Sequence, residues 1–131
     1  MVASTWGNLT RGLDGEDLAK LTVFRDFCRT IPEVQERIHS SEIAYARNRV
    51  FASAYVKSHY LELGIELLRE VDDPKPRTRF PTTKTVTMHR YSLRRIEQFD
   101  ERLRALIQEA ADTVGPGARV RRNVVDPGRS R

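Results

Sequence analysis

The sequence predicts an α+β domain in which an antiparallel sheet of three to four strands carries helices packed on one face. Three observations predict this fold. Apolar side chains recur at helical spacing over residues 18–28 and 96–110, and apolar and polar side chains alternate over residues 61–67. The candidate strands also follow one another between residues 42 and 91, which is typical of an antiparallel sheet. The acidic side of residues 61–67 predicts that the second face of the sheet carries no helices.

The first predicted helix spans residues 15–29. Asp14 suits the N-cap position, and Glu16 and Asp17 place negative charge in the first turn, where the helix dipole favours it. Pro32 disfavours a helical conformation at the residue before it, so we expect this helix to end near Arg29.

A second, short helix is predicted over residues 32–40. Thr30 and Glu33 have the spacing of a capping box, and Pro32 lies in the first turn, where its missing N–H costs no hydrogen bond. Val34 and Ile38 lie one turn apart and would form its apolar side.

The next segment reads as strands. In residues 61–67 the leucines and isoleucine would face the core, whereas Glu62 and Glu66 would lie on the solvated side. The predicted strands are residues 43–47, 50–57, 61–67 and 84–91. Residues 71–82 hold three prolines without any periodicity, which indicates a surface loop.

The last predicted helix spans residues 96–114, because Gly115 suits its C-terminal cap and Pro116 prevents its continuation. We therefore expect a single domain over residues 1–115. Residues 116–131 form a basic C-terminal tail, which we expect to be disordered. The tail holds five arginines and one aspartate, so most of the net charge of +5 lies outside the predicted fold.

Composition excludes several classes of protein. A length of 131 residues, with 39% apolar and 31% charged residues, suits one globular domain. No stretch approaches the ~18 apolar residues of a membrane-spanning helix, so we expect no membrane partner. No apolar run of signal-peptide length lies near the N-terminus, and the single cysteine, Cys28, permits no internal disulfide. We therefore expect a cytoplasmic protein in which Cys28 is buried and inert.

The order of the motifs resembles a known family. Residues 42–47 read E-I-A-Y-A-R, residues 49–52 read R-V-F-A, and an alternating leucine strand follows at residues 61–65. A helix of the type of residues 23–27 precedes these strands, and one of the type of residues 99–111 follows them. Over residues 18–114 the chain resembles a small bacterial family, domain of unknown function 5655, also found at the C-terminus of chains labelled predicted transport proteins. The resemblance implies an α+β fold and brings no catalytic residues with it.

No motif predicts catalysis or a cofactor. His39, His59 and His89 have no second His, Cys or acid at a metal-binding spacing. The glycines near the N-terminus follow no strand and form no phosphate loop, and no G-x-S-x-G motif occurs. We therefore predict no catalytic residue, no metal site and no cofactor.

Basic and aromatic side chains gather on the predicted strands. Rings that stack on bases, beside cations that meet phosphates, are what binding of single-stranded nucleic acid requires, and the same groups suit an anionic ligand. The leading hypothesis is a non-enzymatic binding or interaction module. Alternation alone leaves open which of these side chains face the core. The candidate ligand-binding residues are Tyr45, Arg47, Arg49, Tyr55, Lys57, His59 and Arg90.

Two alternatives come from other classes of protein. One is a small enzyme whose site is assembled from Glu66, His59, His89 and Lys57. The other is a homo-oligomer, or a protein that binds a partner, through an open edge of the sheet. The arginines of the tail suit either a nucleic-acid-binding arm or a solubilising end.

Overall fold

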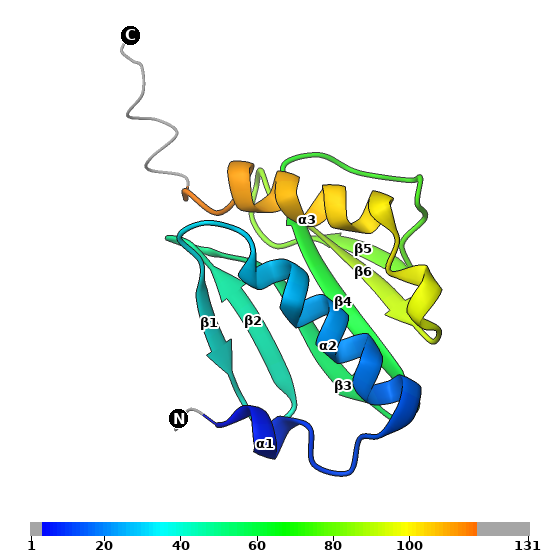
Figure 1. Ribbon diagram of the computed structural model, residues 1–131. Coiled ribbons are helices and arrows are strands. Elements are labelled where there is room, and N and C mark those ends of the chain that lie inside the picture. The colour runs from blue at the N-terminus through cyan, green and yellow to red at the C-terminus, as the bar shows by residue number, and fades with distance from the viewer. Residues whose placement is uncertain (1–3, 118–131) are drawn as a thin grey trace, which may run out of the picture.

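The computed structural model describes residues 4–117, which form one six-stranded antiparallel sheet with two long helices on one side (Figure 1). The strand order is β1-β2-β3-β4-β6-β5. The α+β class and the antiparallel sheet are confirmed, but the sheet has more strands than the three to four predicted. The strands are β1 (Gln35–Ile38), β2 (Glu42–Ala46), β3 (Val50–Lys57), β4 (Tyr60–Leu67), β5 (Thr78–Pro81) and β6 (Thr87–Leu93). The helices are α1 (Trp6–Leu9), α2 (Gly15–Arg29), the 3-10 turn η1 (Ile96–Gln98) and α3 (Glu101–Thr113).

The two long helices begin where their capping signals lie. Asp14 occupies the N-cap of α2, and the acidic residues Glu16 and Asp17 lie in its first turn. The last predicted helix is divided in two. Its first residues form η1, and α3 starts anew after Asp100, whose side chain accepts a hydrogen bond from the backbone N–H of Leu103.

The predicted helix over residues 32–40 is wrong, because this segment contains strand β1. Glu33 adopts a positive φ of 65°, which a helix cannot contain. Exposed and half-buried residues then alternate along Gln35–Ile38, and each residue pairs with β2. The capping-box spacing therefore had no effect here, because pairing with β2 stabilises an extended chain more than local capping stabilises a short helix.

The predicted loop over residues 71–82 contains a further strand, β5, which pairs with β6. Its last residue, Pro81, lies on an edge strand, where a missing N–H is tolerated. The strand predicted over residues 84–91 begins later, at Thr87, because residues 82–86 form the turn between β5 and β6.

The register sorts the side chains onto two faces. One row across the sheet consists of four buried residues, Tyr45, Ala52, Ile65 and His89. The ring of Tyr45 packs edge to face against the ring of Phe24 on α2, with the two centroids 5.7 Å apart. The next row consists of Ala44, Ser53, Gly64 and Arg90 and points to the opposite face. The hydrophobic core therefore lies between the sheet and α2 and α3.

Two expectations concern the ends and the surroundings of the chain. The tail over residues 116–131 is predicted to be disordered, but from residue 118 on it lies outside the described residues. Among the helices that the structure describes, none is long and apolar enough to cross a membrane.

Candidate functional site

The face of the sheet away from α2 and α3 carries charged and aromatic side chains instead of apolar ones. Both long helices lie on the other side (Figure 1), so within residues 4–117 this face has no helix over it. We call it the uncovered face. Alternation along β3, β4, β5 and β6 brings these side chains to it: Tyr55, Lys57, Glu62, Glu66, Phe80, Met88 and Arg90.

Two glutamates of β4 are buried on the uncovered face by arginines that lie over them. Glu62 is 3% exposed and accepts hydrogen bonds from Arg77 and Arg90. Glu66 is 8% exposed and accepts hydrogen bonds from Arg49 at 2.6 Å and from the hydroxyl of Thr82 at 3.3 Å. The prediction that these two glutamates lie on a solvated face is therefore wrong. Sequence periodicity placed them on the correct face but gave no sign of the arginines that cover them.

Arg90 lies between two aromatic rings on this face. Its guanidinium carbon is 5.4 Å from the ring centroid of Tyr55 on β3 and 5.5 Å from that of Phe80 on β5, both within cation–π range. Phe80 is 38% exposed. Burial raises the pKa of the Tyr55 phenol, and the nearby Glu42 carboxylate raises it further. The Nε of Arg90 is buried and has no hydrogen-bond partner among the described residues. The arrangement presents ring faces and guanidinium donors side by side.

Four of the seven predicted binding residues lie on or beside the uncovered face. Tyr55, Lys57 and Arg90 project from it, and Arg49 reaches it from the start of β3 through its bond to Glu66. The ammonium of Lys57 is 5.8 Å from the ring centroid of Tyr55. Tyr55, Lys57 and Arg90 therefore form one basic and aromatic cluster, whereas Arg49 lies farther along the same face, beside Glu66.

The other three predicted binding residues lie elsewhere. Tyr45 is fully buried under α2, where its hydroxyl donates to Glu36 at 2.7 Å, and burial raises its pKa. Arg47 donates to the carbonyls of Pro32 and Ala111 and to the carboxylate of Asp112. His59 lies in the β3–β4 turn with a φ of 66° and a side chain that is 87% exposed. Tyr45 and Arg47 therefore have structural partners, whereas the exposed His59 lies at one end of the sheet with its Nδ1 3.9 Å from a carboxylate oxygen of Asp17.

Two residues of the uncovered face were missed by the sequence reading. Phe80 and Arg77 belong to the proline-rich segment that was read as a loop. The alternation of β5 spans only four residues, which is too short to separate a strand from an irregular segment by period alone.

The four residues of the enzyme alternative are not brought together. His89 is buried on the helix-covered face, where its Nε2 accepts a hydrogen bond from the N–H of Val71 at 3.0 Å. Glu66 lies on the other face, and Lys57 and His59 lie at the opposite end of β4 from it. Within the described residues no three side chains of His, Cys, Asp or Glu gather in a way that would hold a metal ion.

Comparison with known proteins gives a family and no function. A family model described as Domain of unknown function (DUF5655) matches residues 25–114, from the middle of α2 to the end of α3. Neither the curated proteins nor the solved structures contain a match to this chain. The matched region includes every strand of the sheet and therefore the whole uncovered face.

Proposed function

The chain belongs to the DUF5655 family of domains of unknown function, and we propose that it is a binding module whose uncovered face holds single-stranded nucleic acid. The observation that carries this proposal is the position of Arg90 between the rings of Tyr55 and Phe80 on the uncovered face. Every base has a π-face, so rings set beside cations accept a strand of any sequence.

Charge supports the same ligand. Two acids of the uncovered face, Glu62 and Glu66, are buried and paired. A third, Glu42 on β2, is half-buried beside Tyr55. The cations that reach solvent on this face outnumber Glu42: they are Arg49, Lys57, Arg77 and Arg90. Lys57 is exposed and forms no ion pair with any described residue, and the Arg77 side chain is 53% exposed. A polyanion that lies across the face would meet these cations at its phosphates.

The shape of the site favours a strand over a small substrate. Tyr55, Arg90 and Phe80 come from three strands, and the line through them crosses the sheet diagonally. An extended chain of nucleotides that follows this diagonal is able to contact all three and to continue to the exposed cations at either end.

A binding experiment tests the proposal directly. Fluorescence anisotropy of labelled single-stranded DNA and RNA, about 20 nucleotides long, would be measured with the full chain at low and at moderate salt. Phe80→Ala and Tyr55→Ala are each expected to weaken binding about 5- to 160-fold, which corresponds to about 1–3 kcal/mol per stacked base. Added salt is expected to weaken binding further, because phosphate contacts release counterions.

A pair of charge reversals supplies the control. Lys57→Glu on the uncovered face is expected to weaken binding, whereas Arg29→Glu, at the end of α2 on the other side of the sheet, is expected to leave it unchanged. Lys57 and Arg29 are both exposed and free of ion pairs within residues 4–117, so neither change breaks an ion pair that stabilises the fold. Both variants keep the arginines of the tail. Equal affinity in wild type, Lys57→Glu and Phe80→Ala would assign any observed binding to the tail and contradict the proposal.

A further inference from the structure

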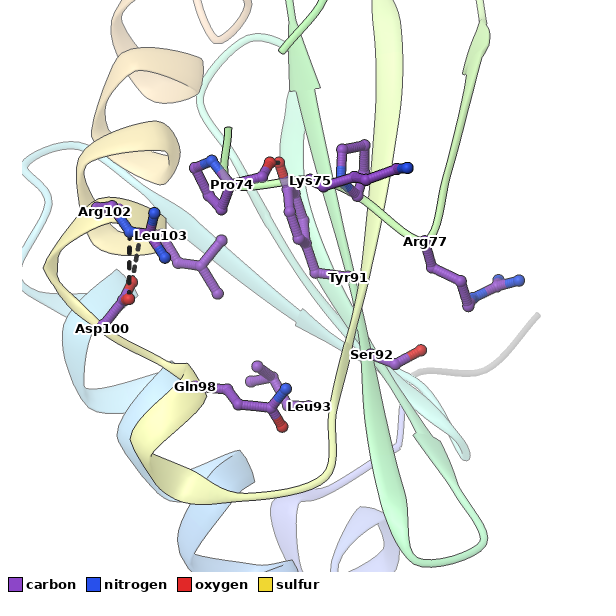
Figure 2. A pocket seen from close by; sticks show the side chains of 11 residues that line it. Pro74, Lys75, Arg77, Tyr91, Ser92, Leu93, Gln98, Asp100, Arg102 and Leu103 are labelled. Carbon is purple, nitrogen blue, oxygen red and sulfur yellow. Dashed lines mark hydrogen bonds and ion pairs between the residues drawn. The ribbon is translucent and has the colours of Figure 1, made fainter. Parts of the chain in front are cut away.

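A hollow of about 500 Å³ lies apart from the aromatic cluster of the uncovered face, between the last residues of β6, the segment 74–77 and the start of α3 (Figure 2). This volume falls within the range of small-molecule sites, about 300–1,000 Å³. Its wall residues come from segments far apart in the sequence. They are Pro74, Lys75, Pro76, Tyr91, Leu93 and Leu103, with Arg77, Ser92, Gln98, Asp100 and Arg102 around them.

The hollow exists because β5 is shorter than β6. Strand β5 pairs only with Thr87–Arg90, so the outer edge of β6 has no partner strand from Tyr91 to Leu93. The N–H of Arg77 donates to the carbonyl of Arg90, which shows that the backbone groups of Arg90 point outward. By alternation the N–H and C=O of Ser92 point to the same side, where β5 no longer covers them. A ligand in the hollow would therefore meet a backbone donor and acceptor.

The floor of the hollow is apolar and rigid. Tyr91, Leu93 and Leu103 are each at most 6% exposed, and Figure 2 shows Leu103 and Tyr91 on opposite sides of it. The hydroxyl of Tyr91 donates to the carbonyl of Pro74 at 2.8 Å, which ties the proline segment to the sheet. Burial raises the pKa of Tyr91 to about 12, so this donor keeps its proton at neutral pH. An aromatic ring of a ligand would pack against these three apolar side chains.

The rim of the hollow is cationic. Lys75 is exposed and has no ion-pair partner within the described part of the chain. Arg102 is 60% exposed; its Nη1 donates to Asp73 and its Nε to Asp100, and its second terminal nitrogen remains available. Asp100 also accepts the N–H of Leu103 as the cap of α3, so its carboxylate is already occupied. Arg77 turns away toward Glu62 on the uncovered face (Figure 2).

We infer that this hollow binds a small organic anion: a flat ring that packs against Tyr91, Leu103 and the prolines, with a phosphate or carboxylate group at Lys75 and Arg102. An apolar floor with a few polar groups at its rim is typical of small-molecule sites. The inference does not depend on the nucleic-acid proposal, because Tyr55, Phe80 and Lys57 take no part in the hollow.

Titration by two-dimensional NMR of the ¹⁵N-labelled full chain tests the inference. The probes are adenosine 5′-monophosphate (AMP), which carries ring and phosphate, adenosine, which carries the ring alone, inorganic phosphate, and salicylate as the carboxylate counterpart. AMP or salicylate is expected to shift the amide signals of Tyr91, Ser92, Leu93 and Arg102. Its affinity is expected to be at least about tenfold higher than that of adenosine or phosphate, a difference of about 1.4 kcal/mol. Shifts with AMP but not with salicylate would identify a phosphate ligand, and shifts with salicylate but not with AMP would identify a carboxylate ligand.

Variants separate this site from the uncovered face. Lys75→Glu and Arg102→Ala are expected to weaken AMP or salicylate binding about tenfold or more, because each removes a charge-assisted contact. Lys57→Glu is expected to leave it unchanged. The inference is overturned if neither anionic probe shifts the β6 amides, or if Lys75→Glu binds them as wild type does. Shifts confined to Tyr55 and Arg90 would assign the probe to the uncovered face. This result would also overturn the inference about the hollow, and it would leave the nucleic-acid proposal standing.

Discussion

Single buried polar side chains hold the helix-covered side of the sheet together. His89 is fully buried; its Nδ1 lies 3.1 Å from the carbonyl of Thr87, and its Nε2 accepts the N–H of Val71. An imidazole that accepts at Nε2 must be neutral and must carry its proton on Nδ1. Lys20, 1% exposed, donates to the carbonyls of His59 and Arg94 and so joins α2 to the ends of β3 and β6. Both residues are therefore structural and belong to no ligand site described above.

Protonation of His89 is expected to destabilise the fold. Burial lowers its pKa in the folded state, so the folded chain binds this proton less readily than the unfolded chain, whose histidine titrates near 6.5. The stabilisation is complete above about pH 6.5 and is lost progressively as the pH falls below that value. Urea unfolding at a series of pH values is expected to show this loss at a higher pH than the titration of carboxylates such as Glu109. Hydrogen bonds from Arg69 lower the pKa of Glu109 below its usual value of about 4.5.

Two variants isolate the histidine. His89→Gln keeps an acceptor for Val71 without a titrating group, so its free energy of unfolding should change little between pH 7 and pH 5. His59→Gln serves as the control, because His59 is exposed and its removal should leave the wild-type pH profile intact. A His89→Gln profile as steep as that of the wild type would refute this assignment.

At the scale of secondary-structure elements, the C-terminus of α3 is attached to the β2–β3 turn. The carbonyl of Gly115 accepts the N–H groups of both Asn48 and Arg49, at 2.9 and 3.0 Å. Arg47 adds a hydrogen bond to the carbonyl of Ala111, inside the last turn of α3. These contacts satisfy carbonyl groups that a helix end leaves without intrahelical partners.

Gly115→Ala is expected to destabilise the protein by about 1–3 kcal/mol, the usual cost of overpacking a tight contact. A Cβ at this position would lie 2.2 Å from the backbone oxygen of Ala111, so α3 or the turn would have to move. The urea midpoint measures the effect. Gly7→Ala is the matched control: its Cβ would have only ordinary contact, 3.8 Å from the Thr5 hydroxyl, inside α1. The control should be neutral or more stable by up to about 1 kcal/mol; equal destabilisation by both changes would contradict the assigned clash.

At the scale of the whole molecule, both edge strands of the sheet are protected, and the part of the outer edge of β6 without a partner strand spans only residues 91–93. The edge strands β1 and β5 have four residues each, and short edge strands that carry charges or proline resist pairing with another chain. The N–H of Ser4 also donates to the carbonyl of Ile38 on β1. These features count against association through a sheet edge.

We therefore expect a monomer. Light scattering coupled to size exclusion should give a mass near 15.1 kDa for the full chain, independent of protein concentration. A mass that rises with concentration, and that falls back when Gln35 on β1 or Thr78 on β5 is replaced by lysine, would instead support the sheet-edge alternative, because an added charge on an edge strand opposes pairing with another chain.

Local pattern predicted the parts of this fold that local interactions dominate. The α2 and α3 helices and the strands β3 and β4 were recognised because each spans eight residues or more, which is long enough for its periodicity or composition to be read from the sequence. The short strands β1 and β5 were missed, since each holds four residues and is stabilised by a neighbour distant in the sequence. For the same reason Tyr55, Lys57 and Arg90 were named as a group, whereas Phe80 was not.

Periodicity and the order of the elements along the chain suffice to predict an α+β domain with an antiparallel sheet and helices on one side. Three features become visible only in the folded chain: the six strands of the sheet, the burial of Tyr45 in the core, and the position of Arg90 between Tyr55 and Phe80. The difference lies in the range of the interactions. Periodicity and capping act between residues a few positions apart, whereas strand register, the burial of Glu62 under Arg77 and the end of β5 beside β6 depend on contacts between distant segments.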